Sequence, residues 1–345
     1  MPFTRWIRRL AVAGVLLCFA VVVLGAYVRL TAAGLGCPDW PGCYGHLTPA
    51  GAEHNPDAPS AWPNRPLEPG KAWREMIHRY AAGTLAAVIL AIAVLAIAAR
   101  RQRVVKVWFA LTLLGAVIVQ ALLGMLTVTW QLRPAIVTLH LLLGMSTLAL
   151  LWWLLLSLPV NSWGATSLRS AGRAIEGGAN SPFAMARRLT RLGLLALALQ
   201  IALGGWTSSN YAALACPDLP TCQGAWWPHT DFRHAFALHS GAQIDYEGGV
   251  LDNPARATIQ LTHRVGALVT AVILTLAALF VLRRRSFPGA RLPAWLLLAA
   301  LALQLVIGVS MVLKSFPLWL ATSHTAEAAL LLLATLAVLR RLSAR

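Results

Sequence analysis

The chain has 345 residues, of which 58% are hydrophobic and only 12% are charged. This composition excludes a soluble globular protein, because it leaves too little polar surface, and is typical of an integral membrane protein. The formal net charge of +17 does not indicate a nucleic-acid-binding protein, because the basic residues alternate from loop to loop along the chain.

Eight predominantly apolar windows predict eight transmembrane helices. Unbroken runs of Leu, Ala, Val and Ile, as in residues 85–99, exclude the alternating polarity of a β-barrel strand. The predicted fold class is therefore an all-α integral membrane protein. In chain order the windows are 10–28, 78–99, 107–127, 135–158, 192–208, 259–282, 293–313 and 318–339.

The placement of basic residues predicts the orientation in the membrane. With alternate loops on opposite sides, 19 of the 29 Lys and Arg residues lie on the side of the two termini and eight on the other. The positive-inside rule then places both termini in the cytoplasm and the long loops 29–77 and 209–258 outside. The leader 1–9 is too short for a transit peptide and precedes an apolar run too long for a signal-peptide core, which favours a bacterial cytoplasmic membrane.

The chain also contains an internal repeat. Residues 25–45 align with 204–224 at an offset of 179, and both contain C-P-D-x-P-x-C. The repeat continues through the histidines: His78-Arg79 recurs as His263-Arg264, and Gln120, Gly124 and His140 recur as Gln304, Gly308 and His324. Landmarks repeated in this order predict two tandem four-helix bundles with pseudo-twofold symmetry about the membrane normal.

The repeat defines the predicted units. They are an N-terminal half, 1–158, a cytoplasmic linker, 159–191, rich in Ser, Gly, Ala and Arg, and a C-terminal half, 192–345. Each half has one long outer loop. We expect each half to hold its own site.

Each even-numbered helix carries one histidine, within about six residues of its outer end. These are His78, His140, His263 and His324. Ionisable residues are costly inside a bilayer and mark functional sites. Because the four share one depth, we expect His78 to face His140 and His263 to face His324, as axial haem ligation inside a four-helix bundle requires. A single buried His would more simply be a polar residue bonded to a neighbouring helix.

The residues next to two of the histidines add to this hypothesis. Arg79 and Arg264 are suited to binding haem propionates. Glu75, one turn from His78, has Gln260 as its second-half counterpart. A carboxylate can take a proton from a substrate or stabilise a cation, whereas an amide cannot, so Glu75 is the candidate catalytic residue. An ion pair with Arg74 or Arg79 is the alternative use of this carboxylate.

The outer loops carry paired cysteines. Cys37 and Cys43 stand in the first loop, and Cys216 and Cys222 occupy equivalent positions in the second. In an oxidising compartment such pairs form local disulfides. Metal binding and a redox relay are the alternative interpretations.

These residues resemble the haem A synthases of bacteria and mitochondria over nearly the whole chain. The resemblance rests on the tandem halves, Glu75-x-x-His78-Arg79, Gln260-x-x-His263-Arg264, the histidines at 140 and 324, and the two cysteine loops. It implies oxidation of a ring methyl of haem O to the formyl group of haem A.

The resemblance also implies a division of labour between the halves. His78 and His140 would bind the iron of the substrate, haem O, with Glu75 as the catalytic carboxylate. The second pair, His263 and His324, would ligate a cofactor, haem b. The implied partners are haem O synthase upstream and cytochrome oxidase assembly downstream, while the oligomeric state, including a homo-oligomer, stays open.

Three other functions compete with this interpretation. A diheme cytochrome b for quinol-linked electron transfer would also need four histidines at one depth, but gives no reason for Glu75. A transporter would predict helices broken by Gly or Pro at the midplane, and the windows contain few such breaks. A di-metal carboxylate enzyme would need further carboxylates beside Glu75-x-x-His78.

Overall fold

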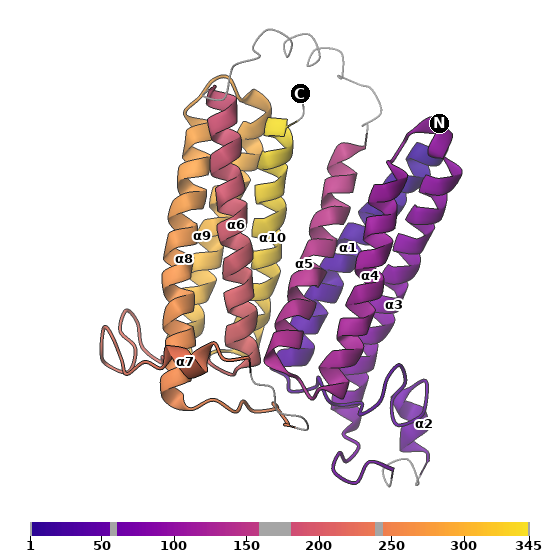
Figure 1. The fold of residues 1–345 in the computed structure, drawn as a ribbon, viewed down its shortest axis with the longest axis vertical. Coiled ribbons are helices and arrows are strands. Elements are labelled where there is room, and N and C mark those ends of the chain that lie inside the picture. The colour runs from indigo at the N-terminus through magenta and orange to yellow at the C-terminus, as the bar shows by residue number, and fades with distance from the viewer. Residues whose placement is uncertain (1, 56–60, 159–180, 239–243, 344–345) are drawn as a thin grey trace.

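The computed structural model describes residues 2–55, 61–158, 181–238 and 244–343 (Figure 1). Over these ranges the regular structure is helical, with no strand, and eight helices are long and apolar enough to cross a membrane. The predicted fold class is therefore confirmed. The spanning helices are α1 (Pro2–Leu30), α3 (Pro69–Ala98), α4 (Val107–Thr129), α5 (Pro134–Ser157), α6 (Pro182–Ser209), α8 (Asn253–Leu282), α9 (Pro288–Leu313) and α10 (Leu318–Ser343).

Shorter helices lie in the connections. α2 (Pro49–Glu53) and α7 (Phe232–Ala235) belong to the two long loops that we predict to lie outside, and the 3₁₀ helix η2 (Arg100–Gln102) joins α3 to α4. The spanning helices turn many leucines outward, as at Leu16 and Leu195, which are 66% and 58% exposed. An outer surface this apolar is stable in lipid but not in water.

Several helices extend beyond the apolar windows, because helix ends are polar and hydropathy does not detect them. α3 begins at Pro69, nine residues before the window, so Glu75 lies inside a helix. α6 begins at Pro182, where Ser181 caps it by accepting a hydrogen bond from the N–H of Ala184. Residues 182–191 of the predicted linker 159–191 are therefore helical, while residues 159–180 lie outside the described residues.

The spanning helices form two groups of four. Figure 1 shows α1, α3, α4 and α5 together and α6, α8, α9 and α10 together. Between the groups, α5 packs against α6 and α1 against α10. The repeat equates α1 with α6 and α5 with α10, so these two interfaces are equivalent to each other. Contacts of this kind are what a twofold axis between the groups would produce, and the axis itself stays a prediction.

One side-chain contact between the two groups of helices also joins equivalent positions of the repeat. Arg29 donates from Nη2 to the carbonyl oxygen of Ser208 at 2.7 Å and stacks on the ring of Tyr211, 4.1 Å from its centroid. Arg29 and Ser208 are equivalent positions of the repeat, 179 residues apart. The first group is therefore joined to the second at the C-terminal ends of α1 and α6.

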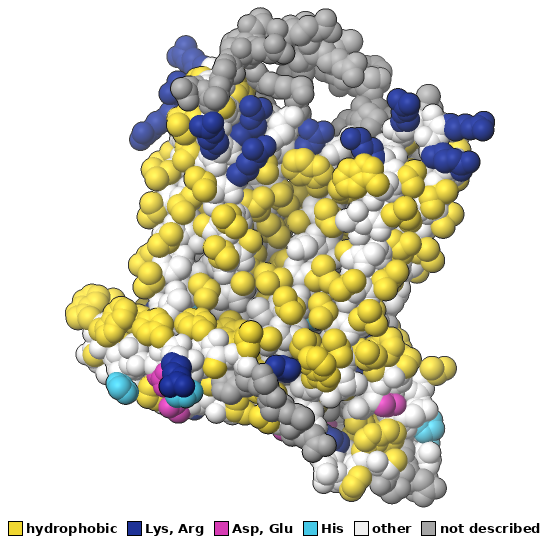
Figure 2. All heavy atoms as spheres, viewed as in Figure 1, with side chains coloured by type: hydrophobic (Ala, Val, Ile, Leu, Met, Phe, Trp, Pro, Cys, Tyr) yellow, Lys and Arg dark blue, Asp and Glu magenta, His cyan; other side chains and the backbone are white. Residues whose placement is uncertain are grey.

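Charge divides the molecule along the helix axes. Figure 2 shows Lys and Arg gathered at the end where α1 begins and α10 finishes, with His, Asp and Glu on the outer loops at the opposite end. Between them lies an apolar belt over the helices. This is the distribution from which the cytoplasmic placement of both termini was predicted.

Candidate haem-binding site

One continuous cavity of about 1900 Å³ runs through both groups of helices. All four predicted histidines line it, on α3, α5, α8 and α10. Most of its other lining residues are apolar, among them Val22, Leu141 and Leu301. The cavity exceeds the volume that ordinary small-molecule pockets reach, roughly 300–1,000 Å³.

The depth of two histidines along their helices differs from the prediction. His140 and His324 lie six residues after the first residue of α5 and α10. His78 lies nine residues into α3 and His263 ten into α8, so the limit of about six residues was wrong for these two. The reason is again the polar first turns of α3 and α8, which extend outward beyond the apolar windows.

Each histidine ring packs against a glycine of the preceding spanning helix. A Cβ built at Gly25 would lie 3.0 Å from Cε1 of His78, and one at Gly204 would lie 3.3 Å from Cε1 of His263. The second histidine of each pair is packed in the same manner: a Cβ built at Gly124 would lie 3.3 Å from Cε1 of His140, and one at Gly308 would lie 3.1 Å from Cε1 of His324. Side chains at these four positions would displace the rings, so glycine keeps the space for them.

The histidines retain unused hydrogen-bonding capacity. Among the described residues, Nδ1 of His78, His140 and His324 is buried without a hydrogen-bond partner. Gln120 lies against His140, with its Nε2 3.0 Å from the carbonyl oxygen and 3.4 Å from ring Nε2. Nε2 of Gln304 lies 3.3 Å from ring Nε2 of His324. Buried ring nitrogens without partners, beside an apolar cavity, fit a ligand that supplies a metal ion.

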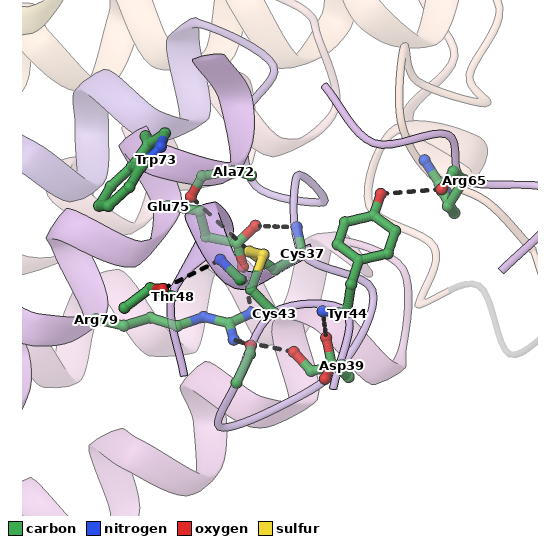
Figure 3. Close-up of a disulfide and its surroundings, with 12 residues drawn as sticks. Cys37, Asp39, Cys43, Tyr44, Thr48, Arg65, Ala72, Trp73, Glu75 and Arg79 are labelled. Atoms are coloured by element: carbon green, nitrogen blue, oxygen red, sulfur yellow. Dashed lines mark hydrogen bonds and ion pairs between the residues drawn. A yellow bond between two sulfur atoms is a disulfide. The ribbon is translucent and has the colours of Figure 1, made fainter. Parts of the chain in front are cut away.

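Glu75 lies in the same cavity, 4% exposed. Its Oε1 accepts from Nη2 of Arg79 at 2.5 Å, and its Oε2 accepts from the backbone N–H of Cys37 at 2.8 Å (Figure 3). Of the two ion pairs considered from sequence, the one with Arg79 is present, whereas Arg74 donates to the carbonyl oxygen of Gly70. The carboxylate is thus fixed in place on both oxygens.

Arg79 also binds the first cysteine loop. Its Nη1 donates to the carbonyl oxygens of Asp39 at 2.9 Å and Gly42 at 2.6 Å. Figure 3 shows the guanidinium between Glu75 and this loop. Arg79 therefore connects the carboxylate, α3 and the disulfide loop, a role that sequence reasoning missed.

The second half repeats this arrangement without the carboxylate. Arg264 donates from Nη1 to the carbonyl oxygen of Thr221 and from Nη2 to that of Cys216, both at 2.8 Å. Gln260 is 5% exposed, and its Oε1 is buried without a partner. Since both arginines already bind loop carbonyls, their propionate role stays a prediction.

Both cysteine pairs are disulfide-bonded, as the spacing predicts. Cys37 pairs with Cys43, and Cys216 with Cys222, with Cα atoms 4.7 and 4.6 Å apart. Their partnership leaves no free thiols in these two loops, which argues against metal binding by the pairs.

The aspartate of each C-P-D sequence stabilises its loop. Asp39 accepts from the N–H groups of Tyr44 and Gly45. Asp218 is arranged equivalently: the hydroxyl of Thr221 and the N–H of Gly224 hold the pKa of Asp218 below its ordinary value. The signal that could have revealed this role was the occurrence of the aspartate in both loops.

Comparison with known proteins places these features in a family. Residues 8–336 match the model of the COX15-CtaA family, described as cytochrome oxidase assembly protein. The chain is 42% identical to a haem A synthase of Shewanella oneidensis over 331 residues, covering 95% of this chain and 93% of that protein. Haem A synthases of a Caulobacter species and of Halalkalibacterium halodurans are 28% and 27% identical, each over at least 91% of both chains.

Proposed function

The chain belongs to the COX15-CtaA family of cytochrome oxidase assembly proteins, and we propose that it is a haem A synthase that oxidises a ring methyl of haem O to the formyl group of haem A. The observation that carries the reaction is an asymmetry. Two equivalent pairs of histidines line one cavity, but among the described residues the only carboxylate in the lining is Glu75, beside the first pair; Glu327, one turn from His324, is buried outside the lining. That difference supports our proposal that the substrate reacts in the first half.

The histidines supply the binding groups that haem requires. His263 and His324 would hold haem b as the cofactor of the second half, and His78 and His140 would bind the iron of haem O in the first. Haem b, when bound, accepts and passes on electrons one at a time. Three features of the cavity fit a flat, hydrophobic metal complex. They are the buried ring nitrogens without partners, the glycines that pack against the histidine rings, and the apolar walls.

In the proposed reaction Glu75 handles the protons. Oxidising a methyl group to a formyl group removes electrons and protons and adds one oxygen atom, by way of a hydroxymethyl group and a gem-diol that loses water. As electrons leave the bound haem O, the methyl group becomes acidic, and the Glu75 carboxylate takes up its proton. Arg79 and the N–H of Cys37 keep the carboxylate oriented toward the cavity.

The cellular setting follows from the family and the charge pattern. The protein is a multi-pass membrane protein, and its bacterial relatives indicate the cytoplasmic membrane, with both termini in the cytoplasm as part of the proposal. Haem O synthase would supply the substrate, and cytochrome oxidase assembly would receive the product. Arg79 and Arg264 would also bind the haem propionates.

Expression together with haem O synthase, in a bacterium that makes no haem A, tests the proposed function. Haems are extracted into acidified solvent and separated by chromatography. We expect haem A to accumulate. Accumulation of haem O alone, with the protein present in the membrane, would contradict the proposal and favour an electron-transfer cytochrome.

Replacing Gly25 with Leu is expected to reduce haem binding by the first half several-fold. A Cβ at position 25 would lie only 3.0 Å from Cε1 of His78, so a leucine side chain would collide with the ring. The measurement is the haem O and haem A content per protein. Gly115→Leu is the matched control, because a Cβ at Gly115 meets nothing within 4 Å. Equal losses of bound haem in the two variants would contradict the claim that Gly25 is needed to make room for the His78 ring.

A further inference from the structure

Three side chains in the cavity lining have buried polar atoms without a partner, and the sequence motifs did not single them out. They are Arg29 at the C-terminal end of α1, Tyr211 just after α6, and Arg256 in the first turn of α8. Nε of both arginines and the hydroxyl of the tyrosine are buried without a hydrogen-bond partner among the described residues. Because buried polar groups in native proteins are nearly always hydrogen-bonded, three of them in one cavity indicate a site for a polar ligand.

These side chains lie at one level, at the boundary between the two groups of helices. The guanidinium of Arg29 stacks on the ring of Tyr211, 4.1 Å from its centroid. α6 and α8 pack against each other in antiparallel directions, and Gly204 of α6 lies against His263 of α8. Seven residues further along α6 is Tyr211, and seven residues back along α8 is Arg256. In this register Tyr211 lies level with Arg256.

The cluster offers hydrogen-bond donors and a positive charge that no acidic residue neutralises. Neither Arg29 nor Arg256 forms a salt bridge within the described part of the chain. Arg29 donates from Nη2 to the carbonyl oxygen of Ser208, which leaves its other donors free. The carboxylate of Asp252, one turn before Arg256, accepts from the N–H of Ala255 instead. Two guanidinium groups and a phenol form a set of donors that suits a carboxylate or a phosphate.

The first half has no equivalent cluster. At the repeat offset of 179, the counterpart of Tyr211 is Ala32, and both residues have a left-handed backbone, with φ of 54° and 49°. The turn is therefore the same in both halves, and only the side chain differs. At the offset of 185, the counterpart of Arg256 is Lys71, which already forms an ion pair with Glu68 at 2.8 Å. The cluster thus belongs to the second half, with one arginine supplied by α1.

The position of Arg256 relates the cluster to the histidines of the second half. Arg256 precedes His263 by seven residues on α8, which is close to two helical turns. The two side chains therefore share one face of the helix, about 10 Å apart along its axis. The propionate carboxylates of a haem lie at a comparable distance from its iron. A haem held by His263 and His324 thus reaches the cluster with a propionate.

We propose that Arg29, Tyr211 and Arg256 bind a propionate of the haem in the second half. The first half then supplies part of the binding site for the cofactor of the second. Arg264 already donates to two loop carbonyls, whereas the donors of this cluster are free. Charge-assisted hydrogen bonds to a carboxylate are the stronger kind, so the cluster favours retention of this haem. This inference rests on the proposed function.

Protohaem and its dimethyl ester, whose propionates carry no charge, provide the test. Each is titrated, with absorbance as the readout, into a purified chain with His78→Ala and His140→Ala, so that haem enters only the second half. We expect protohaem to bind at least about 10-fold more tightly than the ester. Arg256→Gln should weaken protohaem binding about 10- to 100-fold, and Tyr211→Phe less, with little change for the ester. Lys71→Gln, the same kind of change at the equivalent position, is the control and should alter neither affinity.

A second measurement separates propionate binding from general damage. Loss of the Arg256 charge should lower the midpoint potential of the haem, because a nearby positive charge favours the reduced state. Tyr211→Phe keeps the ring that stacks on Arg29 and removes only the hydroxyl.

Equal affinity for protohaem and its ester before any change in the cluster would overturn the inference. A lipid phosphate as the natural anion would give that equality, together with loss of copurified phospholipid from Arg256→Gln. An unaltered protein that binds no haem b would instead overturn the proposed function.

Discussion

Glu75→Gln is expected to abolish conversion of haem O to haem A while leaving the bound haem in place. The amide occupies nearly the same volume and can still accept the hydrogen bond from the N–H of Cys37, but it cannot take up a proton at the substrate methyl. Loss of a general base costs about 10²- to 10⁴-fold in rate. The ratio of haem A to haem O in acid extracts measures the effect.

The repeat provides a matched control for this substitution. Gln260→Glu makes the reciprocal change at the equivalent position, also buried in the second half. We expect haem A output to depend on position 75 and not on position 260. Full haem A output from Glu75→Gln would show that the carboxylate serves only its ion pair with Arg79.

His263→Ala is expected to remove haem b and, with it, all conversion. Because the ring is an iron ligand in this account, its loss should weaken haem b binding by at least about 100-fold, the upper end of the effect of a supporting residue. The first half keeps His78 and His140, so haem O should still be bound but not oxidised. The measurement is the haem composition of the purified variant.

An exposed histidine gives the corresponding control. His229 lies in the second outer loop, away from the cavity lining, and His229→Ala should retain both haems. Retention of haem b by His263→Ala, in the amount bound by the unaltered protein, would contradict the assignment of His263.

Much of the architecture could be predicted because the membrane restricts it. Backbone groups in lipid must be hydrogen-bonded internally, so long apolar runs become helices. Ionisable residues inside such runs are costly, which singled out His78, His140, His263 and His324. The cysteine pairs were predictable for a different reason: their spacing is short and local, so no knowledge of the tertiary fold was needed.

Other features depend on contacts between distant segments and could not be predicted. The bonds from Arg79 to Asp39 and Gly42 link a helix to a loop 37 to 40 residues away, and nothing in the local sequence specifies them. The contact of Gln200 with His263 escaped notice because the first-half equivalent of Gln200 is Val21, so the repeat that revealed the other landmarks did not include it.

The most direct test of the account is the identity of the haems bound to the purified protein. After expression with haem O synthase and purification in detergent, the absorption spectrum and chromatography of the acid extract identify each haem. The account predicts haem b together with haem O or haem A, because each pair of histidines holds one haem. A protein that contains no haem would contradict the central claim that the cavity is a haem-binding site.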